Sequence, residues 1–368
     1  VLENYYDKKT EDKFQKLYKD TYIGKNPTKL KNSYCILRFN FSGIDTNNAE
    51  STMKGFKNKT ISSIGVFIQK YGLDFYINTQ NEAEEILNDL FKAFYIQKAS
   101  EKIYVIIDEY DHFANELLSF NPNGFKDLVS KNGKVRKWYE TLKEGTETVV
   151  DRIFITGVAP ITLDSLTSGF NIGTDISQDV RFNEMMGFTK EELEELLNNQ
   201  EISKNEQEKI LPIMKENYDG YRFNLKAEKQ IYNSNMCLFF LSGYMWSKNI
   251  PDKLIDMNIA SDYSKIGKML DLCKGENRLE ILQKTVQGTL ISSNIVEKFN
   301  PAMEFTETDM ISMLYYLGYL TISGEDLGIP ELVIPNKVMK KIYASYFMQL
   351  MNQEADFRID NTRHRSFK

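Results

Sequence analysis

Five apolar residues in a row, Ile103–Ile107, limit more than any other feature what this chain can fold into. The run shows no alternation of apolar and polar residues, so both faces of the strand that it predicts must be covered. Such strands lie at the centre of parallel sheets. Arg152–Gly157 predicts a second strand of this type, and we therefore expect an α/β fold.

Helical patterns separate the predicted strands in the first half of the chain. A third strand is predicted at Tyr34–Phe41, because its β-forming residues end at Ser42-Gly43. Amphipathic helices are predicted at 11–22, 49–71, 81–98 and 125–144. Strands that alternate with long helices form crossover units, so we expect a parallel sheet with helices on both faces.

The pattern changes to mainly helical after about residue 185. Thr189 and Glu192 form a predicted capping box, and further helices are predicted at 204–218, 234–247, 262–273 and 277–290. The end of the chain predicts helix 307–317, strands 319–323 and 332–335, and helix 336–351, an order that resembles a winged helix. We expect three domains: an α/β core over 1–185, a helical region over 186–300 and a winged-helix-like region over 301–368.

Composition excludes several classes of protein. The 368 residues carry a formal charge of −6, and no apolar run approaches the length of about 20 residues that a membrane-spanning helix needs. Two histidines are too few for a multi-histidine metal site, and three scattered cysteines fit neither a disulfide framework nor a zinc site. We expect a cytoplasmic protein without membrane contact. The mild acidity argues against nucleic-acid binding by the whole surface but leaves a local basic patch open.

Asp108 and Glu109, which directly follow the apolar run, are the main candidate catalytic residues. Ligands of open parallel sheets bind beyond the carboxyl ends of the strands, where an Asp can hold Mg²⁺ and a second acid can act on a water that attacks phosphate. A solvated acidic loop or a helix cap is the commoner explanation of such a short pattern, and it suits Asp111 and His112 well.

Two further sites carry polar residues that could act on phosphate. Thr156 lies at the end of the Arg152–Gly157 strand, where it could contact a phosphate or the attacking water; a plain strand end is equally consistent. Arg222, in the segment Tyr218–Phe223, could stabilise phosphate charge, although packing between helices is the more common role. The loop 165–171 could bind substrate or simply connect two elements.

Eight segments follow one another along the chain: VLENYYD (1–7), LRFNFS (37–42), VIIDEYD (105–111), FITGVAP (154–160), SGFN (168–171), MGFT (186–189), YDGYRF (218–223) and LYYLGYL (314–320). Taken in this order they resemble the bacterial AAA-ATPase-like family of predicted P-loop ATPases, and residues 334–336 also match. The resemblance covers nearly the whole chain, and it is the ordered series rather than any single segment that makes it specific.

The resemblance implies a P-loop NTPase-like core that hydrolyses ATP with Mg²⁺. Asp108 then matches the metal-binding Walker B acid, Glu109 the acid that activates water, and Thr156 a sensor-type position. The family's glycine-rich phosphate loop lies just upstream of the residues that match Leu2–Tyr5, and no Gly-x-x-x-x-Gly-Lys-Ser/Thr segment occurs in this sequence. We therefore expect a core without its first strand and phosphate loop, and without the nuclease-like domain that members commonly carry at the C-terminus.

An alternative function is a catalytically inactive ATPase-fold scaffold or regulatory interaction module. Nucleic-acid binding through 307–351 is a third hypothesis, based on the winged-helix-like order and on Lys337, Lys340 and Lys341, although a solvated helix face is the more common role of such lysines. The partner is then a protein or a nucleic acid that the sequence does not identify. Many AAA-type proteins form rings, so a homo-oligomer is also an expectation.

Overall fold

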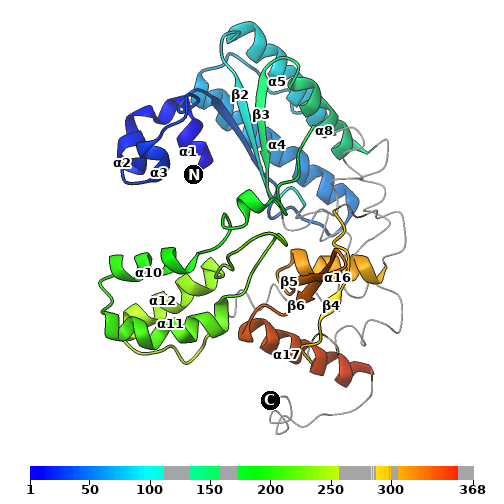
Figure 1. Ribbon diagram of the computed structural model, residues 1–368. Helices are drawn as coiled ribbons and strands as arrows, with labels where there is room; N and C mark the ends of the chain where they lie inside the picture. The colour runs from blue at the N-terminus through cyan, green and yellow to red at the C-terminus, as the bar shows by residue number, and fades with distance from the viewer. Residues whose placement is uncertain are drawn as a thin grey trace. The chain divides into compact units, whose positions relative to one another are not determined.

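The fold is given by a computed structural model (Figure 1). It describes residues 1–111, 133–157, 172–256, 287–297 and 306–354, together with Gln283, Thr285 and Phe299. The chain divides into two compact units: unit 1 is Val1–Gly173 with Glu297–Met303, and unit 2 is Thr174–Val296 with Glu304–Lys368. The three-domain division with boundaries at 185 and 300 stays a prediction.

Unit 1 is built on a parallel sheet of three strands. The strands are β1 (Cys35–Asn40), β2 (Ile103–Asp108) and β3 (Val150–Ile155), in the order β1-β2-β3. The register places Val105 of β2 between Leu37 of β1 and Ile153 of β3. The predicted α/β class and parallel sheet are confirmed, and the apolar run Ile103–Ile107 forms the central of these three strands.

Three long helices cover one face of this sheet. They are α4 (Ala49–Tyr71), α5 (Ala83–Gln97) and α8 (Lys134–Gly145) (Figure 1). Trp138 of α8 packs edge-on against Phe39 in β1, Phe41 just after β1 and Phe56 of α4, with ring centroids 4.9–5.6 Å apart. Trp138 is fully buried, so this aromatic cluster is the centre of the core on the helical face.

The opposite face of the sheet contacts the N-terminal segment. Tyr6 of α1 (Leu2–Tyr6) packs against Tyr34 and Tyr104, at centroid distances of 6.0 and 5.2 Å. The short elements η1 (Lys8–Lys13), α2 (Phe14–Tyr18) and α3 (Tyr22–Lys25) follow. The single helix predicted over 11–22 is therefore wrong: the Thr21 side chain accepts a hydrogen bond from the Gly24 N–H and starts a new helix.

Helix boundaries in the rest of unit 1 follow local capping. Asn48 caps α4 through a capping box with Ser51, and Gly72 ends the helix in the left-handed conformation, so the predicted span 49–71 is confirmed. α5 begins two residues later than predicted. α8 begins at Lys134 in the described chain, and the first part of the predicted helix 125–144 lies outside the described residues.

Unit 2 combines helices with a small antiparallel sheet. Its elements are η2 (Val180–Phe182), α10 (Lys190–Asn199), α11 (Lys204–Tyr218), α12 (Ser234–Ser247), β4 (Ile291–Ser292), α16 (Glu307–Tyr316), β5 (Thr321–Asp326), β6 (Ile329–Val333) and α17 (Lys337–Glu354). The strand order is β4-β6-β5. One hydrophobic core, centred on fully buried residues such as Tyr218 and Phe240, joins the helices and the sheet.

Several predictions for unit 2 are confirmed at the level of elements. The capping box of Thr189 and Glu192 opens α10, and helix, strand, turn, strand and helix follow one another from α16 to α17. The assignment of that order as a winged helix stays a prediction. Helix 262–273 and most of helix 277–290 lie outside the described residues. No helix of the described chain is both long and apolar enough to cross a membrane.

Candidate functional site

Hydrogen bonds join the carboxyl ends of β2 and β3. Asp108 is the last residue of β2, and the Thr156 hydroxyl, one residue beyond β3, donates to Asp108 Oδ1 over 2.7 Å. The Thr156 N–H donates to the Ile107 carbonyl at 2.8 Å, and the Tyr110 N–H donates back to the Thr156 carbonyl at 3.1 Å. The two predicted site residues Asp108 and Thr156 are thus brought together, with one carboxylate oxygen held in a fixed position.

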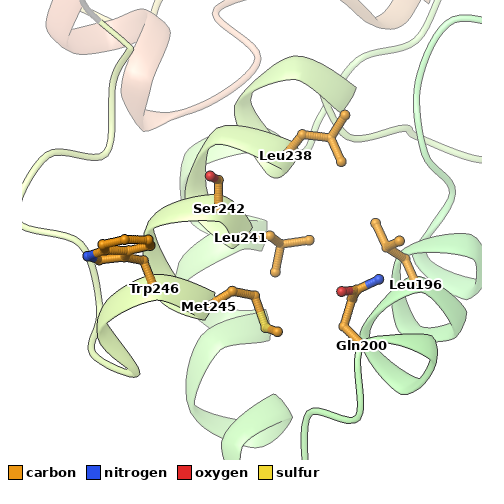
Figure 2. Close-up of a pocket in the computed structure, with 7 residues that line it drawn as sticks. All are labelled: Leu196, Gln200, Leu238, Leu241, Ser242, Met245 and Trp246. Atoms are coloured by element: carbon orange, nitrogen blue, oxygen red, sulfur yellow. The ribbon is translucent and has the colours of Figure 1, made fainter.

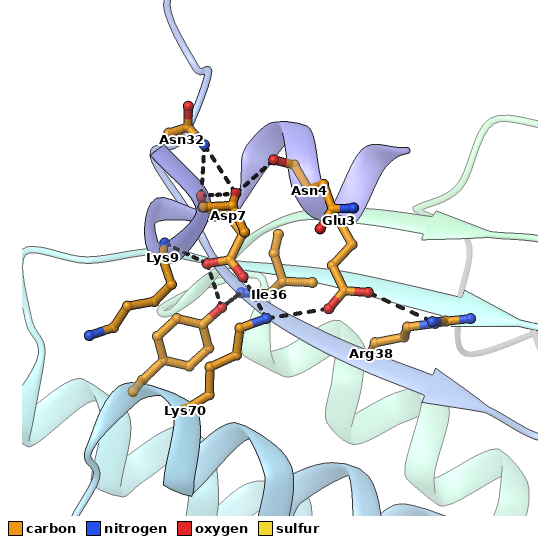
Figure 3. Close-up of polar contacts among 10 residues, drawn as sticks. Glu3, Asn4, Asp7, Lys9, Asn32, Ile36, Arg38 and Lys70 are labelled. Carbon is orange, nitrogen blue, oxygen red and sulfur yellow. Dashed lines mark hydrogen bonds and ion pairs between the residues drawn. The ribbon is translucent and has the colours of Figure 1, made fainter. Parts of the chain in front are cut away.

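Arg38 contacts the other oxygen of the same carboxylate. Arg38 Nη2 lies 3.3 Å from Asp108 Oδ2. Its Nη1 lies 3.7 Å from Glu3 Oε2 (Figure 3). The side chains are between one-third and one-half exposed, so each ion pair is worth about 0–1 kcal/mol and orients the groups more than it stabilises the fold. Arg38 was not among the predicted residues; the signal in the sequence was a charged residue inside an otherwise apolar strand.

Asp7 forms a second polar cluster beside the sheet, and it too was missed. Its side chain is fully buried, and Oδ1 accepts hydrogen bonds from the Lys9 N–H and the Tyr71 hydroxyl, both at 2.9 Å (Figure 3). Lys70 Nζ lies 2.5 Å from Oδ2 and 3.3 Å from a carboxylate oxygen of Glu3.

The surroundings of Lys70 and Tyr71 in this cluster raise the pKa of both side chains. Burial alone would lower the pKa of Lys70, but the hydrogen bond and the charge of Asp7 outweigh it and raise that pKa. Burial raises the pKa of Tyr71 far above its ordinary value, so the hydroxyl stays protonated. That hydroxyl donates to Asp7 and accepts from the Ile36 N–H at 2.8 Å. The cluster therefore ties the N-terminal segment to β1 and α4.

Glu109 has an unusual backbone. Its φ is +53°, in the left-handed region that costs a residue with a Cβ about 1–2 kcal/mol. Such conformations persist where the surrounding structure imposes them, and they cluster at active sites. The residue that the sequence predicts to act on water is thus the one that ends the central strand in a strained turn.

Gly157 lets the two strand ends approach each other closely. A Cβ at this position would lie 2.3 Å from the ring of Tyr110 and 2.4 Å from Asp111 Oδ1. Asp111 is fully buried in a turn. The pKa of Tyr139 is raised mainly because this side chain is buried, and the charge of Asp111 raises it further. His112 and the loop 165–171 lie outside the described residues.

Asp108 and Thr156 supply oxygen donors of the kind that Mg²⁺ prefers. Mg²⁺ is usually bound through one or two carboxylates, with waters and substrate phosphates completing its shell, so one exposed carboxylate beside a hydroxyl fits this ion. Within the described chain, no group of three or more His, Cys, Asp or Glu side chains is placed to hold a metal. The donor set therefore fits a metal that the substrate helps to hold.

Arg222, in unit 2, has a structural role in the described chain. Its Nε–H donates to the Ile322 carbonyl at 3.1 Å, and its backbone N–H donates to the Thr321 hydroxyl at 2.7 Å. Gly220, with a φ of +104°, lets the Pro335 carbonyl come close. These contacts fasten the segment 218–223 to the β5–β6 hairpin and engage the arginine with backbone.

A groove in unit 2 lies between α10 and α12 (Figure 2). Its volume is about 470 Å³, and Leu196, Gln200, Leu238, Leu241, Ser242, Met245 and Trp246 line it. These side chains include no titratable group, so the groove offers apolar contact rather than acid–base chemistry. The strand-end site of unit 1 is therefore the better candidate for catalysis.

Comparison with known proteins supports one assignment. Residues 1–167 match a family described as "Predicted AAA-ATPase". No curated protein and no solved structure matches the chain. The matched segment contains β1, β2 and β3 with Asp108, Glu109 and Thr156. The sequence segments from residue 168 onward that resemble the same family lie outside the matched residues. Over residues 1–167 the chain is thus similar to the AAA-ATPase-like family.

Proposed function

We propose that the protein is an ATPase that hydrolyses ATP with Mg²⁺ at the carboxyl end of β2. The observation that carries the proposal is the pair Asp108–Glu109 at the end of the central strand, with the Thr156 hydroxyl 2.7 Å from the Asp108 carboxylate. The similarity of residues 1–167 to the AAA-ATPase-like family supports the same chemistry.

Each residue of the site has a distinct part in this proposal. Asp108, oriented by Thr156, would hold Mg²⁺, whose charge offsets that of the nucleotide phosphates when it is bound. Glu109, which lies outside the strand, would orient the attacking water and accept its proton. Thr156 would keep Asp108 in place and sense the phosphate from the neighbouring strand.

We extend the proposal to the fold. The parallel order β1-β2-β3 with helices α4, α5 and α8 suits part of a P-loop NTPase sheet, and α16, β5, β6 and α17 suit a winged helix. A phosphate loop would have to supply the backbone N–H groups and the lysine that contact the β- and γ-phosphates.

The test measures ATP hydrolysis by the complete gene product and its variants. Glu109→Gln should lower the turnover rate by about 10²–10⁴-fold, the usual contribution of a general base, while nucleotide still stabilises the protein against heat. The matched control is Glu147→Gln, which removes an exposed carboxylate from the same unit and should leave turnover unchanged. Unchanged hydrolysis in Glu109→Gln would refute the assignment of the base.

Asp108→Asn separates the metal site from the base. We expect this variant to need a higher Mg²⁺ concentration for the same turnover, because an amide is a weaker magnesium ligand than a carboxylate. Chelation of Mg²⁺ should abolish hydrolysis by the unaltered protein. A protein that hydrolyses ATP equally well without divalent metal would contradict the role given to Asp108.

A further inference from the structure

A strongly basic segment follows the first helix of unit 1. Residues 8–31, which we name the lysine lobe, hold η1, α2, α3 and the turns after them. The lobe contains eight lysines and three acidic residues, a net charge of +5, although the whole chain carries −6. The rest of the chain therefore carries −11, and the lobe is a local exception that must repel cations and attract polyanions.

Most of the positive charge of the lobe is free to meet a ligand. Three lysines have partners: Lys8 pairs with Glu101, Lys19 lies 4.0 Å from Asp20, and Lys31 lies 4.2 Å from the ring centroid of Phe14. The other five are exposed and form no ion pair with any described residue. They are Lys9, Lys13, Lys16, Lys25 and Lys29.

A small hydrophobic core that the lobe shares with α1 fixes the backbone of the lobe. Tyr5, Phe14 and Tyr18 are 2–6% exposed and pack together, with ring centroids 5.2–5.7 Å apart. Because Phe14 and Tyr18 point inward, the lysines between and before them point outward. Lys13 and Lys16, three residues apart, are neighbours on one side of consecutive helical turns.

One aromatic ring stands among these charges on the outer surface. Tyr22, the first residue of α3, is 80% exposed, and Lys25 follows one turn later on the same side. A base can stack on an exposed tyrosine while a neighbouring ammonium contacts the phosphate of the same nucleotide.

We infer that the lysine lobe binds single-stranded nucleic acid without sequence preference. A duplex keeps its bases stacked and offers none to Tyr22, whereas a single strand offers both a base and a backbone. The lobe contains no arginine, the residue that most often reads base edges through paired hydrogen bonds, so its contacts are to phosphate. This surface is distinct from the strand-end site, and the inference does not depend on ATP hydrolysis.

An anionic membrane suits the lobe less well. A helix that lies on a membrane buries a continuous apolar face in it. Here Phe14 and Tyr18 are turned into the core and Ile23 is partly buried against it, so the exposed large apolar side chains of the lobe are Leu17 and Leu30, at 44% and 38% exposure, and Tyr22. The charge is present, but the apolar face that would enter the membrane is not.

The experiment measures binding of the whole chain to a labelled oligo-dT of about 20 nucleotides by fluorescence anisotropy. The test variant carries Lys13→Gln, Lys16→Gln and Lys25→Gln. Each lost phosphate contact reduces the slope of log K against log salt by about 0.7, so three reduce it by about 2. Between about 50 and 200 mM salt, the unaltered chain should then lose about 20-fold more affinity than the variant does.

The matched control removes three exposed lysines from unit 2, outside the segment 307–351, through Lys209→Gln, Lys215→Gln and Lys226→Gln. It changes the net charge equally and should leave affinity and slope almost unchanged. Tyr22→Ala should weaken single-strand binding about fivefold or more but leave duplex binding alone, while Tyr22→Phe keeps the stacking ring and the affinity.

Three outcomes would overturn the inference. They are no binding to oligo-dT, equal loss of affinity in the test and control variants, and binding to vesicles that contain phosphatidylserine without binding to oligo-dT. Surface Lys→Gln changes leave the core intact, and an unchanged thermal transition of each variant confirms that the comparison concerns binding rather than folding.

Discussion

The left-handed conformation of Glu109 predicts an unusual order of stability among its variants. Glu109→Ala and Glu109→Gly both remove the carboxylate and whatever it contacts, so they differ only in the Cβ. With φ at +53°, alanine retains a backbone cost of about 1–2 kcal/mol. Glycine avoids it but loses about 0.4–1 kcal/mol through the greater freedom of the unfolded chain. We expect the Glu109→Gly variant to be the more stable by about 0.5–1 kcal/mol.

The same pair of substitutions at an ordinary helical position must give the opposite order. Ser62 is exposed in the interior of α4, in the same unit, and there alanine should be more stable than glycine by about 1 kcal/mol. Urea unfolding can follow unit 1 alone, because Trp138 is buried in its core and Trp246, the other tryptophan, can be replaced by phenylalanine. The Trp138 fluorescence then reports the free energy of unfolding of this unit.

An alanine variant at position 109 that equals or exceeds the glycine variant in stability would show that the turn is not left-handed. The measurement also separates stability from the proposed chemistry. Both variants lack the carboxylate, so both should hydrolyse ATP about 10²–10⁴-fold more slowly, even though one of them relieves the backbone strain. Hydrolysis at the unaltered rate by the more stable Glu109→Gly variant would contradict the proposed base while leaving the account of the backbone intact.

Three further predictions concern the structure around the site. Gly157→Ala should destabilise unit 1 by about 1–3 kcal/mol, because the new Cβ would overlap Tyr110 and Asp111 in the turn after β2. Tyr71→Phe should cost about 1–3 kcal/mol in urea unfolding, because the buried Asp7 carboxylate loses a donor. Burial raises the pKa of Cys35 and of Cys237 to about 12, so both thiols should resist Ellman's reagent in the folded chain, and the unfolding free energy should fall as pH rises from about 9 towards 12.

Matched variants make each of these three predictions specific. Gly65→Ala, inside α4 with no atom near its new Cβ, should stabilise unit 1 by up to about 1 kcal/mol, and a cost equal to that of Gly157→Ala would contradict the packing argument. Tyr95→Phe, at an exposed ring, should change stability by less than about 0.5 kcal/mol. The thiol experiment uses a Cys273→Ser background, and rapid reaction of the remaining cysteines without denaturant would show that they are accessible.

The sequence was a good guide to the sheet and to the long helices because these depend on local pattern. The continuous apolar run of β2 predicted a central parallel strand, and the helical pattern over 49–71 predicted α4, whose ends are capped by Asn48 and Gly72 in the structure. The helix predicted over 11–22 was wrong because one side-chain hydrogen bond, from the Gly24 N–H to Thr21, outweighs a weak apolar period.

The sequence predicted only part of the candidate site. Asp108 and Thr156 follow strand ends, so a rule about parallel sheets was enough to bring them together. Arg38 and Asp108 are 70 positions apart, and their contact depends on the register of β1 against β2, which no local pattern gives. The cluster around Asp7 likewise depends on the packing of α4 against the N-terminal segment.

The conformation of Glu109 follows from the alternation of side chains along β2. Ile103, Val105 and Ile107 are fully buried on one face of the sheet, and a longer strand would place the next odd-numbered residue, Glu109, on that same face. An unpaired carboxylate buried there would cost far more than the 1–2 kcal/mol of a left-handed residue. Ending the strand at Asp108 keeps Glu109 partly exposed beside its neighbour. Both adjacent acids therefore stay partly exposed at one strand end, and the left-handed turn is what keeps Glu109 off the buried face.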